Sequence, residues 1–227
     1  MTALRVLSYN VLSLRLGTDR VAAVVRACAP DVVCVQEAPR FLGWRRRCHA
    51  LADASGLAFV TGGRPAGAVM LMARRDLRVV WARDAKLPWH PPRHRRGAAV
   101  AAFDVGGTEV VVASTHLSLH DDERLQQAGD LLALLRSWDA PAVLAGDVNE
   151  DPDGPAFGLL ADAMADAYAT APDGDGRTST AAHPRRRIDA VFADRRLRVV
   201  SCGAVRVAGA AEASDHLPVL AVLETAR

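Results

Sequence analysis

The sequence has little excess charge and almost no lysine. Its 28 basic and 26 acidic residues leave a net charge of +2 at pH 7, and Lys86 is the only lysine. So small a charge does not indicate a protein that binds nucleic acid through bulk electrostatic attraction. Because the other basic residues are arginine and alanine is abundant, the coding sequence is expected to be rich in G and C. Clusters of arginine can therefore reflect codon usage as well as function.

Long apolar runs are also missing, and none reaches the length of a membrane-spanning helix. The N-terminus enters a strand-like stretch at residues 4–9, without the charged region, apolar region and cleavage site of a signal peptide. The four cysteines, Cys28, Cys34, Cys48 and Cys202, lack the spacing of a metal site. We therefore expect a cytoplasmic protein with no membrane span and no obligate protein partner.

The sequence does contain enough apolar material for one sizeable domain. Half of its 227 residues are hydrophobic, so we expect a single domain over residues 1–227. Strand and helix patterns alternate, which predicts mixed sheets packed between helices. The polar segment 169–184 is expected to be a mobile loop. Helices are expected from Thr18, from about residue 45, from Asp121 or Asp122 and from Pro155. Strands are expected at residues 4–9, 32–35, 57–61, 68–73, 77–81, 98–104, 110–114, 142–145, 188–192, 197–207 and 217–223.

Six short polar motifs accompany these apolar runs. Together they gather carboxylates, carboxamides and histidines at strand ends, which is the chemistry of a divalent-metal phosphoesterase. Any one motif alone would mean little, but the ordered set is hard to produce by chance. The motifs are Ser8-Tyr9-Asn10-Val11, Gln36-Glu37, Ser114-Thr115-His116-Leu117, Gly146-Asp147-Val148-Asn149, Arg187-Ile188-Asp189 and Ser214-Asp215-His216-Leu217.

Each motif also has a plain structural interpretation. Glu37 and Asn10 both follow a strand, so each is expected at a sheet edge, but alone Glu37 would be a solvated loop acid and Asn10 a turn residue. Asp147 and Asn149 are two residues apart and point the same way in extended backbone, where they could orient a water. The alternative for this pair is an Asx-rich turn.

The two histidines indicate catalysis only when they are considered together with the aspartates of the other motifs. His116 follows a run of β-forming residues, and His216 precedes the last apolar strand. A buried carboxylate such as Asp189 would fix the tautomer of His216 and stabilise its protonated form. A lone histidine at a strand end is more often structural, but two histidines with several aspartates shift that balance.

These motifs, from Asn10 to His216, resemble the endonuclease/exonuclease/phosphatase superfamily of deoxyribonuclease I-like, metal-dependent phosphoesterases. The resemblance implies an α/β fold, a four-layer α/β sandwich of two mixed β-sheets flanked by helices, with the site at one end. It also implies a Mg²⁺ cofactor, for which Mn²⁺ could substitute, and a phosphorylated substrate that could be a nucleic acid.

The resemblance implies a role for each matching residue. Asn10 and Glu37 would bind the metal, and Asp215 would add a ligand or hold its waters. Asp147 would orient or deprotonate the attacking water, while Asn149 would contact the phosphate. His216 would contact the phosphate with Asp189 as its partner, or act as the base. His116 would donate to a phosphate oxygen or assist the leaving group. Arg124 and Gln127 resemble a weaker, supporting element on the helix after the His116 loop, and Arg124 is a candidate substrate-binding residue.

Arginine runs at residues 45–47, 93–96 and 185–187 could bind further phosphates of the substrate. Among them Arg187, which begins the motif Arg187-Ile188-Asp189, is the candidate substrate-binding residue. The alternative is a solvated surface enlarged by codon usage. One departure from the family concerns Gly67-Ala68-Val69, where many members carry asparagine. Three hypotheses follow: a Mg²⁺-dependent phosphodiesterase or phosphatase, a DNA endonuclease or exonuclease with the same site, and an inactive binding module.

Overall fold

The computed structural model describes residues 2–225, which form two six-stranded sheets. The first sheet has the strand order β11-β12-β1-β2-β4-β3 and the second β5-β6-β7-β8-β10-β9. The first sheet comprises β1 (Ala3–Asn10), β2 (Val32–Gln36), β3 (Ala58–Gly63), β4 (Val69–Ala73), β11 (Leu197–Ala204) and β12 (Val219–Thr225). The second comprises β5 (Val79–Lys86), β6 (Gly97–Val105), β7 (Thr108–His116), β8 (Ala142–Asp147), β9 (Ala165–Asp166) and β10 (Asp189–Ala193).

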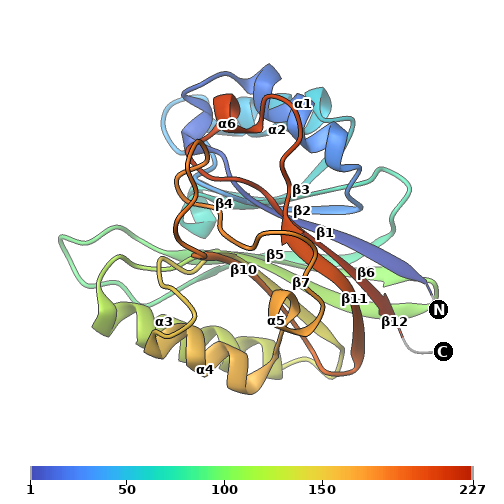
Figure 1. Ribbon diagram of the computed structural model, residues 1–227, viewed down its shortest axis with the longest axis vertical. Coiled ribbons are helices and arrows are strands. Elements are labelled where there is room, and N and C mark those ends of the chain that lie inside the picture. Colours follow the sequence, from blue (N-terminus) through green and yellow to red (C-terminus); the bar gives the residue numbers. More distant parts are fainter. Residues whose placement is uncertain (1, 226–227) are drawn as a thin grey trace.

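Helices cover the outer face of each sheet, as Figure 1 shows. The first sheet is covered by α1 (Thr18–Cys28), α2 (Trp44–Ala54) and α6 (Ala210–Ala213), and the second by α3 (Asp121–Arg136) and α4 (Pro155–Ala163). The remaining helices are α5 (Ala167–Thr170) and the short 3₁₀ turns η1 (Leu12–Leu14) and η2 (Arg64–Ala66). The expected four-layer α/β sandwich of two mixed sheets is confirmed. Within residues 2–225, no helix is both long and apolar enough to cross a membrane.

Three apolar layers hold the sandwich together. The central layer lies between the sheets and includes Val6, Leu71, Phe103 and Val112. The outer layers pack each sheet against its helices. Strands β2 and β4 are buried along their whole length, which explains their continuous apolar sequences, since each sheet is covered on both faces.

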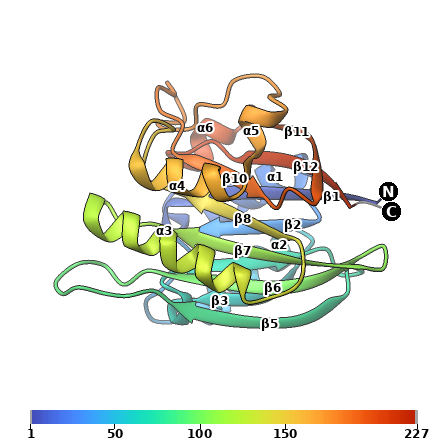
Figure 2. The same cartoon turned by 90° about the horizontal axis from the view of Figure 1, so that it is seen from below.

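Two parallel strand pairs define one end of the sandwich. Strand β1 pairs with β2 in parallel, with Asn10 beside Gln36, and β7 pairs with β8 in parallel, with His116 beside Asp147. Strand β10 runs antiparallel to β8 and begins with Asp189 opposite Asp147. The polar motifs of both sheets therefore meet at one end, away from the two chain termini (Figures 1 and 2).

Some expected boundaries were wrong. The strand expected at residues 77–81 is β5, Val79–Lys86, an exposed edge strand whose charged residues concealed its length. Helix α1 does begin at Thr18, as expected, with Gly17 at its N-cap position. Segment 169–184, expected to be a mobile loop, includes part of α5 and bonds through its backbone to β11.

Candidate active site

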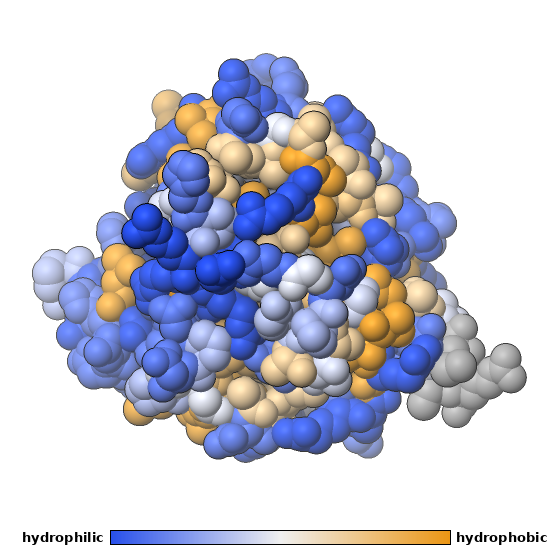
Figure 3. All heavy atoms as spheres, in the orientation of Figure 1, coloured by the Kyte–Doolittle hydropathy of each residue, from blue (hydrophilic) through white to orange (hydrophobic). Residues whose placement is uncertain are grey.

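A cleft of about 480 Å³ opens at the end of the sandwich where the motifs meet. Its lining draws on both sheets and on the loops that follow their strands. Six of the residues expected from the sequence line it: Asn10, Glu37, His116, Asp147, Asn149 and His216. Figure 3 shows strongly hydrophilic side chains gathered at this end of the molecule. The motifs at the strand ends therefore lie together around one cleft.

Asp147 lies at the centre of the cleft and is almost fully buried. Its Oδ2 accepts from Asn10 Nδ2 at 3.0 Å, and its Oδ1 accepts from the backbone amide of Asn149 at 2.9 Å. The Nε2 atoms of His116 and His216 lie 3.4 and 3.9 Å from Asp147 Oδ2. One carboxylate thus faces a carboxamide and two imidazoles, an arrangement suited to handling a proton.

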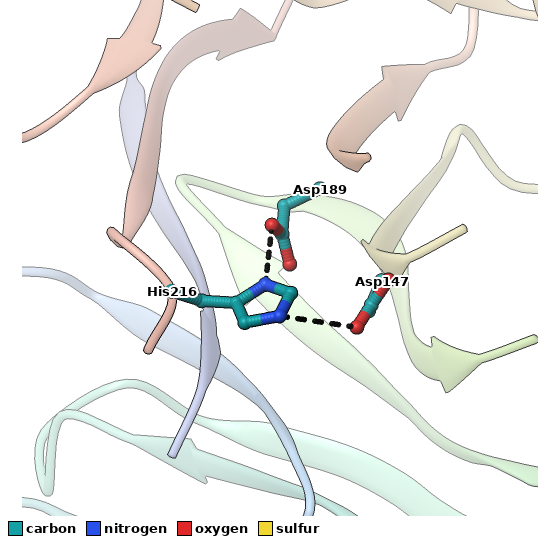
Figure 4. A group of neighbouring side chains, drawn as sticks. All are labelled: Asp147, Asp189 and His216. Atoms are coloured by element: carbon teal, nitrogen blue, oxygen red, sulfur yellow. Dashed lines mark hydrogen bonds and ion pairs between the residues drawn. The ribbon is translucent and has the colours of Figure 1, made fainter. Parts of the chain in front are cut away.

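Asp189 holds His216 from the opposite side of its ring (Figure 4). His216 Nδ1 lies 2.8 Å from Asp189 Oδ2, which also accepts the hydroxyl hydrogen of the fully buried Thr178. Burial lowers the pKa of His216, but the nearby carboxylates of Asp189, Asp147 and Asp215 outweigh it and raise the pKa to about 10. His216 is therefore an imidazolium cation at neutral pH.

His116 has the opposite electrostatics. Burial lowers its pKa to about 3 despite the opposing effect of Asp147, and the neighbouring cations Arg96, His216 and Arg40 lower it further. His116 is therefore neutral at physiological pH. It can donate one hydrogen bond from its imidazole but carries no charge. The two histidines of the cleft, similar in sequence context, thus differ in protonation because only His216 has a carboxylate at each ring nitrogen.

The Glu37 carboxylate supplies oxygen donors at the mouth of the cleft. Its Oε1 lies 3.4 Å from Asn10 Nδ2, the same nitrogen that donates to Asp147, so two carboxylates flank one carboxamide. Glu37 itself has a positive φ of 51°, which turns it out of β2 toward the cleft. The Oδ1 atom of Asn10 accepts from the backbone amide of Leu12 at 3.1 Å.

The Glu37 carboxylate fits a hard divalent cation, whereas the Asn10 oxygen accepts from the Leu12 amide and would have to turn toward the ion. Carboxylate and carboxamide oxygens suit Mg²⁺ or Mn²⁺. The ligand atoms of Asp147, Asp189 and His216 also lie within 4.8 Å of one another. However, His216 Nδ1 and Asp189 Oδ2 already contact each other at 2.8 Å, so the Glu37 carboxylate in the cleft lining provides the better place for an ion. The buried Asp189 Oδ1 has no hydrogen-bond partner among the described residues, which leaves unsatisfied negative charge beside the cleft.

A buried polar bridge beneath the cleft links the two sheets. Gln36 Oε1 accepts from Ser8 Oγ at 3.4 Å, and its Nε2 donates to Ser114 Oγ at 3.3 Å. Ser114 Oγ donates to the Val35 carbonyl at 3.2 Å. Ser8, Gln36 and Ser114 belong to three of the sequence motifs but received no role from the sequence. These three residues lie one or two positions before the cleft residues Asn10, Glu37 and His116. The bridge therefore fixes the distance between the cleft residues of the first sheet and those of the second.

Three expected site residues lie elsewhere. Arg124 is buried and donates to Glu150, Asp121 and the Ser118 carbonyl. Arg187 is ion-paired with Asp166 and packs on Phe157 and Tyr168, outside the cleft lining. Asp215 is exposed, accepts weakly from the Ser214 hydroxyl and does not line the cleft. The substrate roles of the two arginines and the metal role of Asp215 remain predictions, and the arginines are occupied by protein acceptors.

Four arginines line the cleft: Arg15, Arg40, Arg47 and Arg96. Arg47 and Arg96 belong to the arginine runs at residues 45–47 and 93–96, whereas Arg15 and Arg40 received no role from the sequence. Arg40 is exposed, and the buried Nε of Arg96 has no hydrogen-bond partner among residues 2–225. Burial lowers the pKa of Arg96, while the nearby Asp147 and Glu37 raise it. The only sequence signal was the run at residues 93–96, in which nothing distinguished Arg96 except its place just before β6.

Comparison with known proteins agrees with this geometry. The model of the Endonuclease/Exonuclease/phosphatase family matches residues 7–216. No curated protein matches the sequence. A solved endonuclease/exonuclease/phosphatase from Bacteroides vulgatus has 24% identity and a TM-score of 0.84, over 100% of both chains. One from Beutenbergia cavernae has 29% identity and a TM-score of 0.74, over 99% of this chain and 72% of that one. A mannosyl-6-phosphatase from Bacteroides thetaiotaomicron has 20% identity and a TM-score of 0.79, over 97% and 99%.

Proposed function

Because the chain belongs to the endonuclease/exonuclease/phosphatase family, whose members hydrolyse phosphoester bonds, we propose that it is a Mg²⁺-dependent phosphodiesterase or phosphatase. The observation that carries the proposal is the convergence of Glu37, Asp147 and His216 on one cleft, although they come from three distant parts of the chain. Retention of the metal-binding and acid–base groups at one cleft argues against an inactive binding module.

In this proposal Asp147 receives a proton from the attacking water. The water oxygen adds to phosphorus in line with the ester oxygen, and the bond from phosphorus to that oxygen breaks. Asp147 suits this role because its carboxylate is buried and fixed by Asn10 and Asn149. Asn149 also donates to the Leu117 carbonyl, which leaves its second amide hydrogen for a phosphoryl oxygen.

His216 then acts as a donor and not as the base. With a pKa of about 10 it already carries a proton on each ring nitrogen at neutral pH, so it cannot take one from water. Its Nδ1 is held by Asp189, and its Nε2 is free to donate to a phosphoryl oxygen. The neutral His116 donates a second, uncharged hydrogen bond. The alternative in which His216 is the base is therefore not adopted.

Glu37 would be the principal metal ligand, with Asn10 beside it. A bound Mg²⁺ would neutralise charge on the phosphoryl oxygens and on the leaving oxygen. Asp215, as the third expected ligand, would reach the ion only through water or after reorientation, because it does not line the cleft. Both sheets contribute residues to this one centre, in keeping with a single catalytic domain.

The nuclease alternative has less support. Its argument from the sequence was the clustering of arginines, including the run at residues 185–187, against which stood the small net charge. Two of those arginines are ion-paired, Arg186 with Asp151 and Arg187 with Asp166. Their charges are thus compensated within the protein, and they do not form a free track for a nucleic-acid backbone.

The proposal is tested with a substrate panel of plasmid DNA, bis-p-nitrophenyl phosphate, p-nitrophenyl phosphate and inositol phosphates. EDTA should abolish hydrolysis, and Mg²⁺ or Mn²⁺ should restore it. Asp147→Asn and His216→Ala should each lower turnover by at least about a hundredfold. The double variant should lose less than the combined effect of the two single changes, because the residues act as a unit.

Asp153→Asn is the matched control, since Asp153 is exposed and lies six residues from Asp147. It should hydrolyse the panel at the wild-type rate. Full activity after exhaustive chelation would contradict the metal requirement. A strong preference for plasmid DNA would favour the nuclease, and binding without hydrolysis of any substrate would favour the inactive module.

A further inference from the structure

A second, larger cavity adjoins the hydrolytic cleft. It has a volume of about 980 Å³, and its lining shares Arg40, Phe41, Gly67, Ala68, His94 and Arg96 with the cleft. The loop of residues 87–96, which joins β5 to β6, contributes much of the lining and projects beyond the end of the sandwich (Figures 1 and 2). A molecule whose phosphoester lies at Asp147 could therefore extend into this cavity without leaving the protein surface.

The cavity is lined by cations and by no acid among the described residues. Arg64, Lys86 and Arg95 belong to its lining but not to that of the hydrolytic cleft, and within residues 2–225 none of them forms an ion pair. Arg93, by contrast, is paired with Asp122. Elsewhere in the chain, arginines such as Arg187 are neutralised by aspartates. Uncompensated cations around a concave site favour an anionic ligand.

The same region has an unusual apolar rim. The three most exposed large hydrophobic side chains of residues 2–225 are Leu42, Phe41 and Leu119, at 101, 72 and 68%, and all three line the cavity or the cleft. Trp89 also lines the cavity. Single exposed apolar side chains are common on protein surfaces, but several that cluster at one site indicate a ligand with an apolar part.

The rings in this cavity are already paired with guanidinium groups. The guanidinium carbon of Arg95 lies 4.0 Å from the Trp89 ring centroid, and that of Arg40 lies 5.3 Å from the Phe41 ring centroid. Flat rings and flat guanidinium groups suit a flat aromatic ligand better than a flexible acyl chain. Since Arg64, Lys86 and Arg95 line one concave cavity next to the hydrolytic centre, a compact ligand fits better than a long polymer.

We propose that this cavity is a second substrate subsite for a nucleotide-like phosphoester that carries a second phosphate group. Arg64, Lys86 and Arg95 bind the second phosphate, while Trp89 stacks on the aromatic base. The inference rests on the proposed function, since it assigns a substrate class to the same hydrolytic centre. It predicts that a second phosphate on the ligand increases affinity because of these three side chains.

Calorimetric titration in EDTA tests the subsite without hydrolysis. Thymidine 3′,5′-bisphosphate should bind at least about tenfold more tightly than thymidine 5′-monophosphate, since each new contact is a charge-assisted hydrogen bond. The triple variant Arg64→Gln/Lys86→Gln/Arg95→Gln should bring this affinity ratio close to one. Trp89→Ala should weaken both nucleotides by roughly fivefold or more, because the base loses its stacking partner, and wild-type affinity of this variant for both nucleotides would remove Trp89 from the subsite.

Arg136→Gln/Arg185→Gln is the matched control, because both side chains are exposed and outside the cavity. It should keep the wild-type ratio, and a loss equal to that of the triple variant would overturn the subsite. Equal affinity of the wild type for the two nucleotides would also overturn it. A third result would also overturn the nucleotide subsite: the wild type binds phosphatidylserine vesicles, the triple variant does not, and neither nucleotide is preferred. The cavity would then be a binding site for a lipid surface. Failure of the proposed function shows itself separately, as missing hydrolysis with Mg²⁺.

Discussion

Replacing Arg124 with methionine should destabilise the protein without abolishing hydrolysis. The Arg124 side chain is only 7% exposed, and it donates to Glu150 Oε1 at 2.9 Å and to the Ser118 carbonyl at 3.0 Å. A third bond reaches Asp121 at 2.6 Å. Methionine restores much of the volume but leaves the buried Glu150 carboxylate with the Phe157 amide, at 2.8 Å, as its remaining partner.

The magnitude follows from that uncompensated charge. Breaking a buried ion pair by removing one partner costs about 3–5 kcal/mol, a large part of the 5–15 kcal/mol that is typical of a folded domain. For a protein of this size, each kcal/mol lowers the melting temperature by about 2–4 °C, so the expected decrease is roughly 6–20 °C. The double variant Arg124→Met/Glu150→Met removes both charges and should therefore lose less than the two single variants combined.

Urea unfolding gives the free energies, and the KM for bis-p-nitrophenyl phosphate gives substrate affinity under conditions where all variants remain folded. The structural role predicts a large change in the unfolding midpoint with a KM within about threefold of the wild type. The reasoning would be refuted if Arg124→Met unfolded at the wild-type urea concentration while its KM rose more than tenfold. That result would return Arg124 to the substrate-binding role that the sequence suggested.

Three further changes test other parts of the site. Glu37→Gln should raise the Mg²⁺ concentration needed for half-maximal hydrolysis and leave the far-ultraviolet circular dichroism spectrum unchanged; an unfolded variant would instead assign Glu37 a structural role. Gly146→Ala should cost about 1–3 kcal/mol in urea unfolding, because a Cβ would meet the Thr115 carbonyl oxygen of β7 at 2.1 Å. Thr178→Val should lower kcat roughly tenfold with little change in KM, since the buried hydroxyl positions Asp189, whereas Thr178→Ser should restore most of the rate. Equal rates for Val and Ser at position 178 would remove that hydroxyl from the mechanism.

The sequence was most informative where a polar residue follows a buried strand. Asn10, Glu37, His116 and Asp147 were all expected at strand ends, and parallel pairing within each sheet brings those ends together. The fold class followed from the same alternation of strands and helices, and the order of the motifs matched the family. Short-range pattern and composition were sufficient for these features, because each depends on a few consecutive residues.

Contacts between residues far apart in the chain could not be predicted from the sequence pattern. The sequence cannot show that Arg187 meets Asp166, or that Arg124 meets Glu150, so both arginines were assigned to substrate. For the same reason Arg96 received no role of its own, although it lines the cleft. The partner of an arginine decides whether its charge is available to a ligand, and that partner is set by tertiary packing.

The pairing of β1 with β12 has a consequence for the time at which the site can form. Strand β1 lies between β2 and β12, so β1 must wait for a strand that is synthesised much later to complete its hydrogen bonds. His216 lies shortly before β12. A nascent chain interrupted before residue 214 would therefore expose one edge of β1 and lack the imidazolium. The site is thus expected to gain activity only after β12 has been synthesised and has docked beside β1.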